Sequence, residues 1–137
     1  MQPIHTSTFK LRVRYGETDK MGYCYYGNYA QYFEVGRVEA LRELGLSYKS
    51  LEDRGIGLPV RNYSVEFKNP ARYDDEIQII TKVYPLDGLS LPFEYETLDL
   101  EGKVLNTAST ELVFMNLQTG RPMRVPEDVQ SLLTHRA

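Results

Sequence analysis

Apolar and polar residues alternate along residues 8–15, where one side of the segment consists of Phe9, Leu11, Val13 and Tyr15. A period of two residues predicts a half-buried β-strand. Residues 63–67, 77–83, 91–97 and 104–115 are also strand-like and predict four further strands. Short connections between successive strands favour antiparallel pairing.

The apolar period lengthens after residue 27, and this change predicts one long helix. Asn28 is a plausible N-cap and Gly45 suits the C-terminal stop. Two short helices are expected over 48–54 and 126–133, the first capped by Ser47. The apolar positions of the long helix fall at helical spacing: Tyr29, Phe33, Gly36, Ala40 and Leu44.

These elements predict an α+β fold with one long central helix and about five antiparallel strands in a single domain over residues 1–137. One helix covers only part of one sheet face. The remaining face and the sheet edges need cover, so we expect self-association.

The composition narrows the class of protein. Hydrophobic residues make up 42% and charged residues 26%, which is typical of a globular domain. The net charge of -3 and a pI near 5.4 argue against a nucleic-acid partner. Cys24 is the single cysteine and favours a reducing compartment. The sequence has neither a long apolar run nor a signal-peptide pattern at its start, so we expect a cytoplasmic protein without a membrane span.

The scarcity of histidine restricts the available chemistry. The two histidines, His5 and His135, lie near the ends of the chain. No metal-ligand spacing and no glycine-rich phosphate loop is present, so neither a metal nor another cofactor is predicted. Any catalysis must therefore depend on carboxylates, tyrosines and backbone dipoles.

Asp19 is the best candidate for such chemistry, because it lies in a glycine-flanked, tyrosine-rich loop just before the long helix. Glu17 is close enough to raise the pKa of Asp19 if both side chains point the same way. The free N–H groups at the helix start would hold a developing oxyanion, and the carboxylate would activate water or attack directly. A thioester suits this pair, since a thiolate leaves without a strong general acid. The alternative is that Asp19 only forms a turn, as D-x-x-G commonly does.

The chain resembles the hotdog-fold acyl-CoA thioesterases, in particular the 4-hydroxybenzoyl-CoA thioesterase family and its bacterial short-chain acyl-CoA relatives. The resemblance covers about residues 8–132. It rests first on residues 14–22 (RYGETDKMG) with the tyrosines and the start of the helix that follow, and is supported by residues 69–77 and 119–126.

The resemblance implies a central helix wrapped by a curved antiparallel sheet, and a homodimer or homotetramer with active sites at the subunit interface. Asp19 matches the catalytic aspartate of the family, and Tyr26 occupies the position whose backbone N–H polarises the thioester carbonyl. Many short-chain relatives have histidine at the Tyr26 position, which leaves the substrate open. Tyr25, Asn28 and Tyr29 are the candidates for contact with the acyl group.

Other side chains have two interpretations each. Coenzyme A carries phosphates, and Arg72, Arg121 and Arg124 are candidates to bind them, although each also fits ordinary solvated surface. Glu34 is either a base on the helix or the partner of Arg37 in an i,i+3 ion pair, which we favour.

The sequence therefore predicts an enzyme that hydrolyses an acyl-CoA thioester, with Asp19 as general base or nucleophile. The alternative is a non-catalytic hotdog dimer that binds acyl-CoA or another hydrophobic ligand. A hotdog dehydratase or hydratase is disfavoured, because no interior histidine is available for proton transfer.

Overall fold

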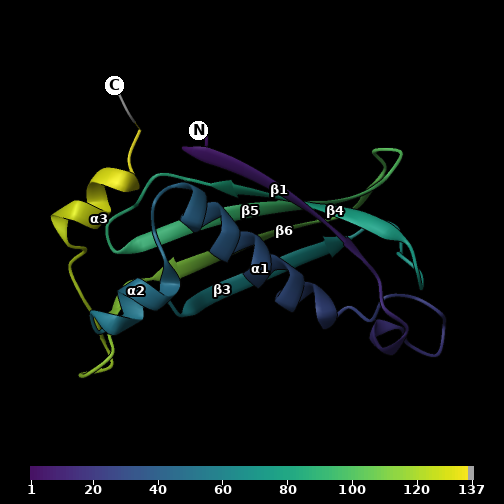
Figure 1. Ribbon diagram of the computed structural model, residues 1–137, viewed down its shortest axis with the longest axis horizontal. Coiled ribbons are helices and arrows are strands. Elements are labelled where there is room, and N and C mark those ends of the chain that lie inside the picture. Colours follow the sequence, from purple (N-terminus) through teal and green to yellow (C-terminus); the bar gives the residue numbers. More distant parts are fainter. Residues whose placement is uncertain (136–137) are drawn as a thin grey trace.

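The computed structural model describes residues 1–135 and has a five-stranded antiparallel sheet at its centre (Figure 1). The strand order is β1-β4-β5-β6-β3. The strands are β1 (His5–Arg12), β3 (Val60–Phe67), β4 (Glu76–Val83), β5 (Ser90–Asp99) and β6 (Val104–Val113). The sheet and its helices confirm the predicted α+β fold.

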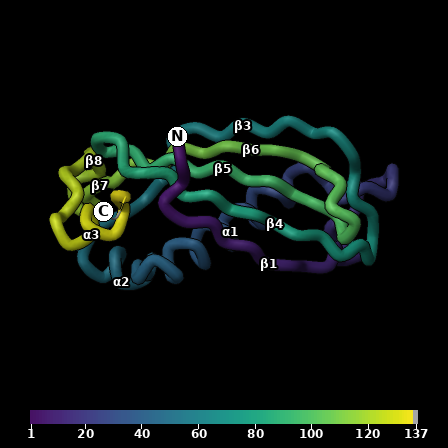
Figure 2. Tube along the Cα trace, turned by 90° about the horizontal axis from the view of Figure 1, so that it is seen from above, coloured from purple at the N-terminus to yellow at the C-terminus, as the bar shows by residue number. Residues whose placement is uncertain are grey.

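The long helix α1 (Asn28–Glu43) crosses one face of this sheet, as Figures 1 and 2 show from two directions. Its buried face carries Phe33 and Ala40, which are fully buried against the sheet. The ring of Phe33 stacks on that of Tyr95 from β5 at 4.5 Å between centroids. Gly36 lets the helix backbone approach Thr81 of β4, where a Cβ atom would overlap the threonine hydroxyl.

The smaller elements gather at one end of the molecule. They are α2 (Tyr48–Asp53), α3 (Glu127–Leu132) and a three-stranded sheet of β2 (Ile56–Gly57), β7 (Met115–Asn116) and β8 (Arg121–Pro122). The Ser47 side chain caps α2 as predicted, accepting the Ser50 N–H at 3.3 Å. The loop that joins β1 to α1 lies at the opposite end (Figure 1) and contains the short 3-10 helix η1 (Tyr15–Glu17).

Two local predictions are wrong. The first strand ends at Arg12 rather than Tyr15, because the chain turns into η1, and the Tyr15 side chain is left 78% exposed. Gly27, not Asn28, is the N-cap of α1, and no side chain caps that helix start. The side chain of Asn28 instead donates a hydrogen bond to the Glu17 carbonyl.

The edge and the outer face of the sheet differ in character. β3 is an edge strand, and it leaves Val60, Tyr63 and Phe67 between 43% and 51% exposed. The face turned away from α1 is polar, with serine, threonine, glutamate and lysine side chains. Of the two surfaces that we expected to need cover, the β3 edge is therefore apolar and the outer face is polar. Within residues 1–135, no helix is long and apolar enough to cross a membrane.

Candidate active site

Asp19 begins a tight hairpin turn whose arms are joined by an antiparallel bridge between Thr18 and Cys24. Its Oδ1 atom accepts the N–H of Met21 at 2.9 Å and that of Tyr23 at 3.1 Å. These bonds fix the carboxylate on its own backbone and leave Oδ2 without a hydrogen bond from the residues that the structure describes. The side chain is half-buried. Asp19 is thus a turn former, and its second oxygen is still available for chemistry.

The same turn occurs a second time, between β5 and β6. There Asp99 Oδ1 accepts the N–H of Glu101 and that of Lys103, both at 2.9 Å. In each turn the residue three after the aspartate is a glycine with positive φ, 81° at Gly22 and 86° at Gly102. The D-x-x-G pattern therefore specifies the turn in both places. What differs is the surroundings of the aspartate.

The start of α1 supplies free backbone donors close to Asp19. Gly27, the N-cap, has no capping side chain, and the N–H groups of Tyr26 and Gly27 have no hydrogen-bond partner among the described residues. Unpaired N–H groups at a helix start attract negative charge because the helix dipole adds to their own. The arrangement is suited to hold an oxyanion.

A cavity of about 300 Å³ brings these features together. Asp19 and Tyr26 both line it, and most of its wall is apolar. Phe67, at the end of β3, lies 6.4 Å from the Tyr26 ring and 5.8 Å from the Tyr29 ring between centroids. The full lining is Asp19, Met21, Tyr23, Cys24, Tyr26, Tyr29, Phe67, Lys68, Asn69 and Pro70.

The predicted acyl-contact residues are only partly brought to this cavity. Tyr29 lines it, with a side chain only 2% exposed. Tyr25 lies beside Tyr26, with ring centroids 4.6 Å apart, but is not part of the wall. Asn28 Nδ2 donates to the Glu17 carbonyl at 2.6 Å, so this side chain ties the loop to the helix.

Glu17 does not act on Asp19 as a like charge in the cavity. Its carboxylate accepts the Arg14 N–H at 2.8 Å and pairs with the Arg14 guanidinium at 3.3 Å. Burial opposes ionisation of Glu17, but the hydrogen bonds from Arg14 outweigh it and its pKa lies below the usual value. The condition that we set for a like-charge effect, that both side chains point the same way, is not met, because the Glu17 side chain turns to Arg14.

Cys24 lies in the cavity wall as a small buried side chain. Its Sγ is 3.4 Å from the Tyr32 hydroxyl, and burial raises the pKa of the thiol. A thiol that resists ionisation is a poor nucleophile. This environment agrees with a packing role for Cys24.

The three predicted phosphate-binding arginines lie at two ends of the fold. Arg72 is exposed next to the cavity, with its guanidinium carbon 5.1 Å from the ring centroid of Tyr23, and the two residues form a backbone bridge. Arg121 belongs to β8 at the far end (Figure 2), and Arg124 follows that strand. Of these three arginines, only Arg72 is near Asp19 within this chain.

The predicted ion pair between Glu34 and Arg37 is wrong. Arg37 turns into the core, where its Nη1 donates to the Tyr95 hydroxyl at 3.1 Å, and the residues that the structure describes include no ion pair for Glu34. The sequence reasoning also missed the wall segment Phe67–Pro70, since the end of β3 is distant from α1 along the chain. Only the motif over residues 69–77 pointed to that region.

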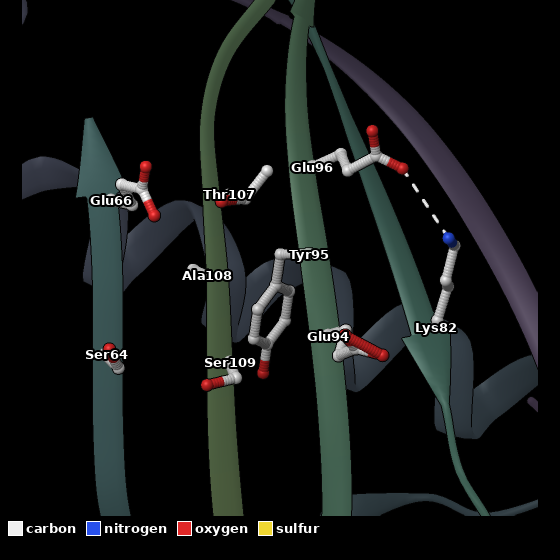
Figure 3. Close-up of a pocket in the computed structure, with 9 residues that line it drawn as sticks. All are labelled: Ser64, Glu66, Lys82, Glu94, Tyr95, Glu96, Thr107, Ala108 and Ser109. Carbon is white, nitrogen blue, oxygen red and sulfur yellow. Dashed lines mark ion pairs between the residues drawn. The ribbon is translucent and has the colours of Figure 1, made fainter. Parts of the chain in front are cut away.

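A larger hollow, of about 360 Å³, lies on the outer face of the sheet with α1 behind it (Figure 3). Four strands contribute its short polar and charged side chains, and Lys82 pairs with Glu96 across it at 3.5 Å. It has no helix start and its wall is more polar than apolar, so it lacks the features of an acyl site. Its lining is Ser64, Glu66, Lys82, Glu94, Tyr95, Glu96, Thr107, Ala108 and Ser109.

Known proteins resemble the chain over most of its length. Residues 13–133 match the model of the thioesterase-like superfamily. A relative named acyl-CoA thioester hydrolase YbgC, from Escherichia coli, is 30% identical over 128 residues, which are 92% of this chain and 96% of that protein.

Solved structures agree with this match. A DHNA-CoA thioesterase from Staphylococcus aureus has a TM-score of 0.88 at 35% identity, covering 93% of this chain and 87% of its own. A gentisyl-coenzyme A thioesterase has a TM-score of 0.82 at 27% identity, and the match covers 90% of this chain and 99% of that protein. These matches confirm the predicted hotdog fold and the family resemblance.

Proposed function

This chain belongs to the thioesterase-like superfamily, and we propose that it hydrolyses an acyl-CoA thioester to a free acid and coenzyme A at the Asp19 cavity. The observation that supports this site most directly is that Asp19 and Tyr26 line one largely apolar cavity of about 300 Å³. The carboxylate and the unpaired N–H groups of the helix start are two halves of an acyl-transfer site.

In the general-base route, Asp19 Oδ2 takes a proton from a water molecule while the water oxygen bonds to the thioester carbon. The carbonyl oxygen becomes an oxyanion and accepts the Tyr26 N–H, a contact worth about 10²–10³ in rate for one such donor. The intermediate then collapses, the C–S bond breaks, and the departing thiolate takes the proton from Asp19. The side chain of Tyr26 is not required for this step, so tyrosine in place of histidine is compatible with it.

In the nucleophilic route, Asp19 Oδ2 bonds to the thioester carbon, the C–S bond breaks, and coenzyme A leaves as a thiolate, so that a mixed anhydride forms. Water then hydrolyses the anhydride to the free acid and Asp19, and the proton that this step releases goes to the thiolate. A single turnover in oxygen-18 water can reveal the nucleophilic route. The general-base route puts the heavy oxygen into the acid product. In the nucleophilic route, water that attacks the aspartyl carbonyl of the anhydride leaves the heavy oxygen in Asp19. Water that attacks the acyl carbonyl puts the heavy oxygen into the acid, as the general-base route does. Heavy oxygen in Asp19 would therefore exclude the general-base route.

The acyl group occupies the aromatic wall, where Tyr29 and Phe67 offer ring surfaces. Tyr25 supports this wall through its contact with Tyr26, and Asn28 holds the loop through the Glu17 carbonyl. Two solved relatives are thioesterases of aromatic acyl-CoAs by name. We include both aromatic and aliphatic acyl-CoAs in the test, because an aromatic wall accepts either.

We propose that two copies pair through the free edge of β3. The exposed side chains of this edge include Phe67, which also lines the cavity, so a second copy would help to close the site. In an antiparallel pairing, the Val60 end of one β3 strand lies beside the Phe67 end of the other. This pairing brings the end of one copy that carries Arg121 and Arg124 towards the cavity of the other, where coenzyme A phosphates would bind.

A panel of acyl-CoAs, assayed for release of free thiol, tests the reaction. Turnover of at least one aromatic or aliphatic thioester is expected. Saturable binding of acyl-CoA with no turnover of any member would instead support the non-catalytic dimer. Native mass spectrometry tests the assembly: we expect a dimer or tetramer, and full activity from a monomer would contradict an interface site.

A further inference from the structure

We propose that a second cavity, between α1 and β3, binds an α-amino acid with an apolar side chain. The cavity has a volume of about 300 Å³ and shares no residue with the Asp19 cavity. This volume lies at the lower end of the range for small-molecule pockets. The inference is independent of the proposed reaction, because it concerns other residues and another class of ligand.

A buried guanidinium lies in the wall of this cavity. Arg37 lines the cavity and is only 7% exposed. Its Nη1 donates to the Tyr95 hydroxyl at 3.1 Å, whereas its Nε is buried without a hydrogen-bond partner within residues 1–135. The Tyr95 hydroxyl also contacts Oγ1 of Thr110, and Thr110 belongs to the same wall. The guanidinium end of Arg37 is therefore next to this part of the cavity.

Arg37 has no counter-ion among the residues that the structure describes. An arginine side chain stays protonated near neutral pH. A charge removed from water is unfavourable unless an opposite charge or a set of hydrogen bonds meets it. A carboxylate in the cavity would supply the opposite charge and accept the unused guanidinium hydrogens.

The same cavity has a negative charge at its rim. Glu34 lies one helical turn before Arg37 and lines the cavity with an exposed side chain. Within residues 1–135, Glu34 forms an ion pair neither with Arg37 nor with another cation. Glu34 would repel a ligand that is only an anion. An α-amino acid carries a carboxylate and an ammonium group on one carbon atom, so it offers a partner to both unpaired charges.

The rest of the wall suits an apolar side chain. Phe33 is fully buried, and its ring lies 6.3 Å from that of Tyr63 between centroids. Val60 and Tyr63 both line the cavity and are partly exposed on β3. These side chains leave apolar surface uncovered, and its burial by a leucine or phenylalanine side chain would be favourable.

Titration calorimetry with L-phenylalanine tests the site, at about pH 6, where an α-amino group is protonated. Saturable binding is expected. Hydrocinnamate is the same acid without its amino group, and L-phenylalaninamide lacks the carboxylate. Each should bind at least about tenfold more weakly, since each loses one charge-assisted interaction. Absence of L-phenylalanine binding, or hydrocinnamate binding as tightly as L-phenylalanine, would overturn the inference.

A rim variant tests the role of the negative charge without a change to the core. Glu34→Gln should weaken L-phenylalanine binding about tenfold and strengthen hydrocinnamate binding, because it removes an attraction from one and a repulsion from the other. Glu39→Gln is the matched control on the same helix, where Glu39 pairs with Arg42 at 3.5 Å outside the cavity. It should change neither affinity. Weaker binding of both ligands in Glu34→Gln, or the same changes in Glu39→Gln, would contradict the assignment.

The buried cation is tested by Arg37→Met, which should abolish binding of both ligands. The ligand series and Glu34→Gln decide the question even where Arg37→Met fails to fold. Val60 and Tyr63 also belong to the free edge of β3, so the proposed pairing of two copies would place this cavity beside the interface. The titrations therefore use the assembled protein, with its oligomeric state followed by native mass spectrometry. Binding to a dissociated form alone would overturn the inference.

Discussion

The contact between Gly36 on α1 and Thr81 on β4 limits how closely the central helix approaches the sheet. An added methyl group at Gly36 would overlap the Thr81 hydroxyl oxygen, which is buried and has no hydrogen-bond partner among residues 1–135. Overpacking of this kind costs about 1–3 kcal/mol. Alanine is about 1 kcal/mol better than glycine inside a helix. Gly36→Ala should therefore lower the free energy of unfolding by about 1 kcal/mol.

Removal of the Thr81 hydroxyl oxygen should reverse the sign of the change that Gly36→Ala makes to the free energy of unfolding. In a Thr81→Ala background the atoms nearest to the new methyl group would be the residue-81 Cβ at 3.5 Å and Ile79 Cγ2 at 3.6 Å, which are ordinary contacts. Gly36→Ala should then stabilise the protein by about 1 kcal/mol through helix propensity alone. Urea unfolding of the four proteins at one protein concentration measures both effects. Equal effects of Gly36→Ala in the two backgrounds would refute the reasoning.

Three further predictions concern buried and partly buried groups. Tyr95→Phe removes the hydroxyl that accepts Arg37 Nη1 and contacts Thr110 Oγ1 at 2.5 Å, so it should lower the free energy of unfolding by about 1–3 kcal/mol, measured by urea unfolding. The His5 side chain lowers the pKa of Glu43, so this carboxylate stabilises the fold above its unfolded pKa of about 4.3. That stability is lost as the pH falls below this value, and the loss should be smaller in Glu43→Gln when the Tm is followed against pH. Cys24 should react with a thiol reagent much faster in urea than in buffer, because burial raises the pKa of its thiol; equal rates would contradict its burial.

Local patterns predicted the elements of the fold well. The spacing of Phe33 and Ala40 predicted the buried face of α1, and both side chains are fully buried. Alternation predicted the strands because each one has an inner and an outer face. The start of α1 was harder to predict, since Asn28 has the chemistry of an N-cap but uses its amide on the Glu17 carbonyl instead.

Contacts between distant segments limited what could be predicted of the site. The i,i+3 rule pairs Arg37 with Glu34, but it takes no account of the hydroxyl that β5 brings to Arg37 through Tyr95. The role of Phe67 depends on how β3 ends beside the start of α1. The D-x-x-G pattern is the same at Asp19 and Asp99, and only the cavity distinguishes them.

The proposed role of Asp19 is tested most directly by kcat for an acyl-CoA in Asp19→Asn, with Asp99→Asn as the matched control. Both substitutions keep the side-chain oxygen that accepts two N–H groups in the same turn. Loss of a general base should lower kcat about 10²–10⁴-fold in Asp19→Asn with little change in binding, and Asp99→Asn should keep the native rate. An unchanged kcat in Asp19→Asn, or an equal loss in both variants, would contradict the assignment.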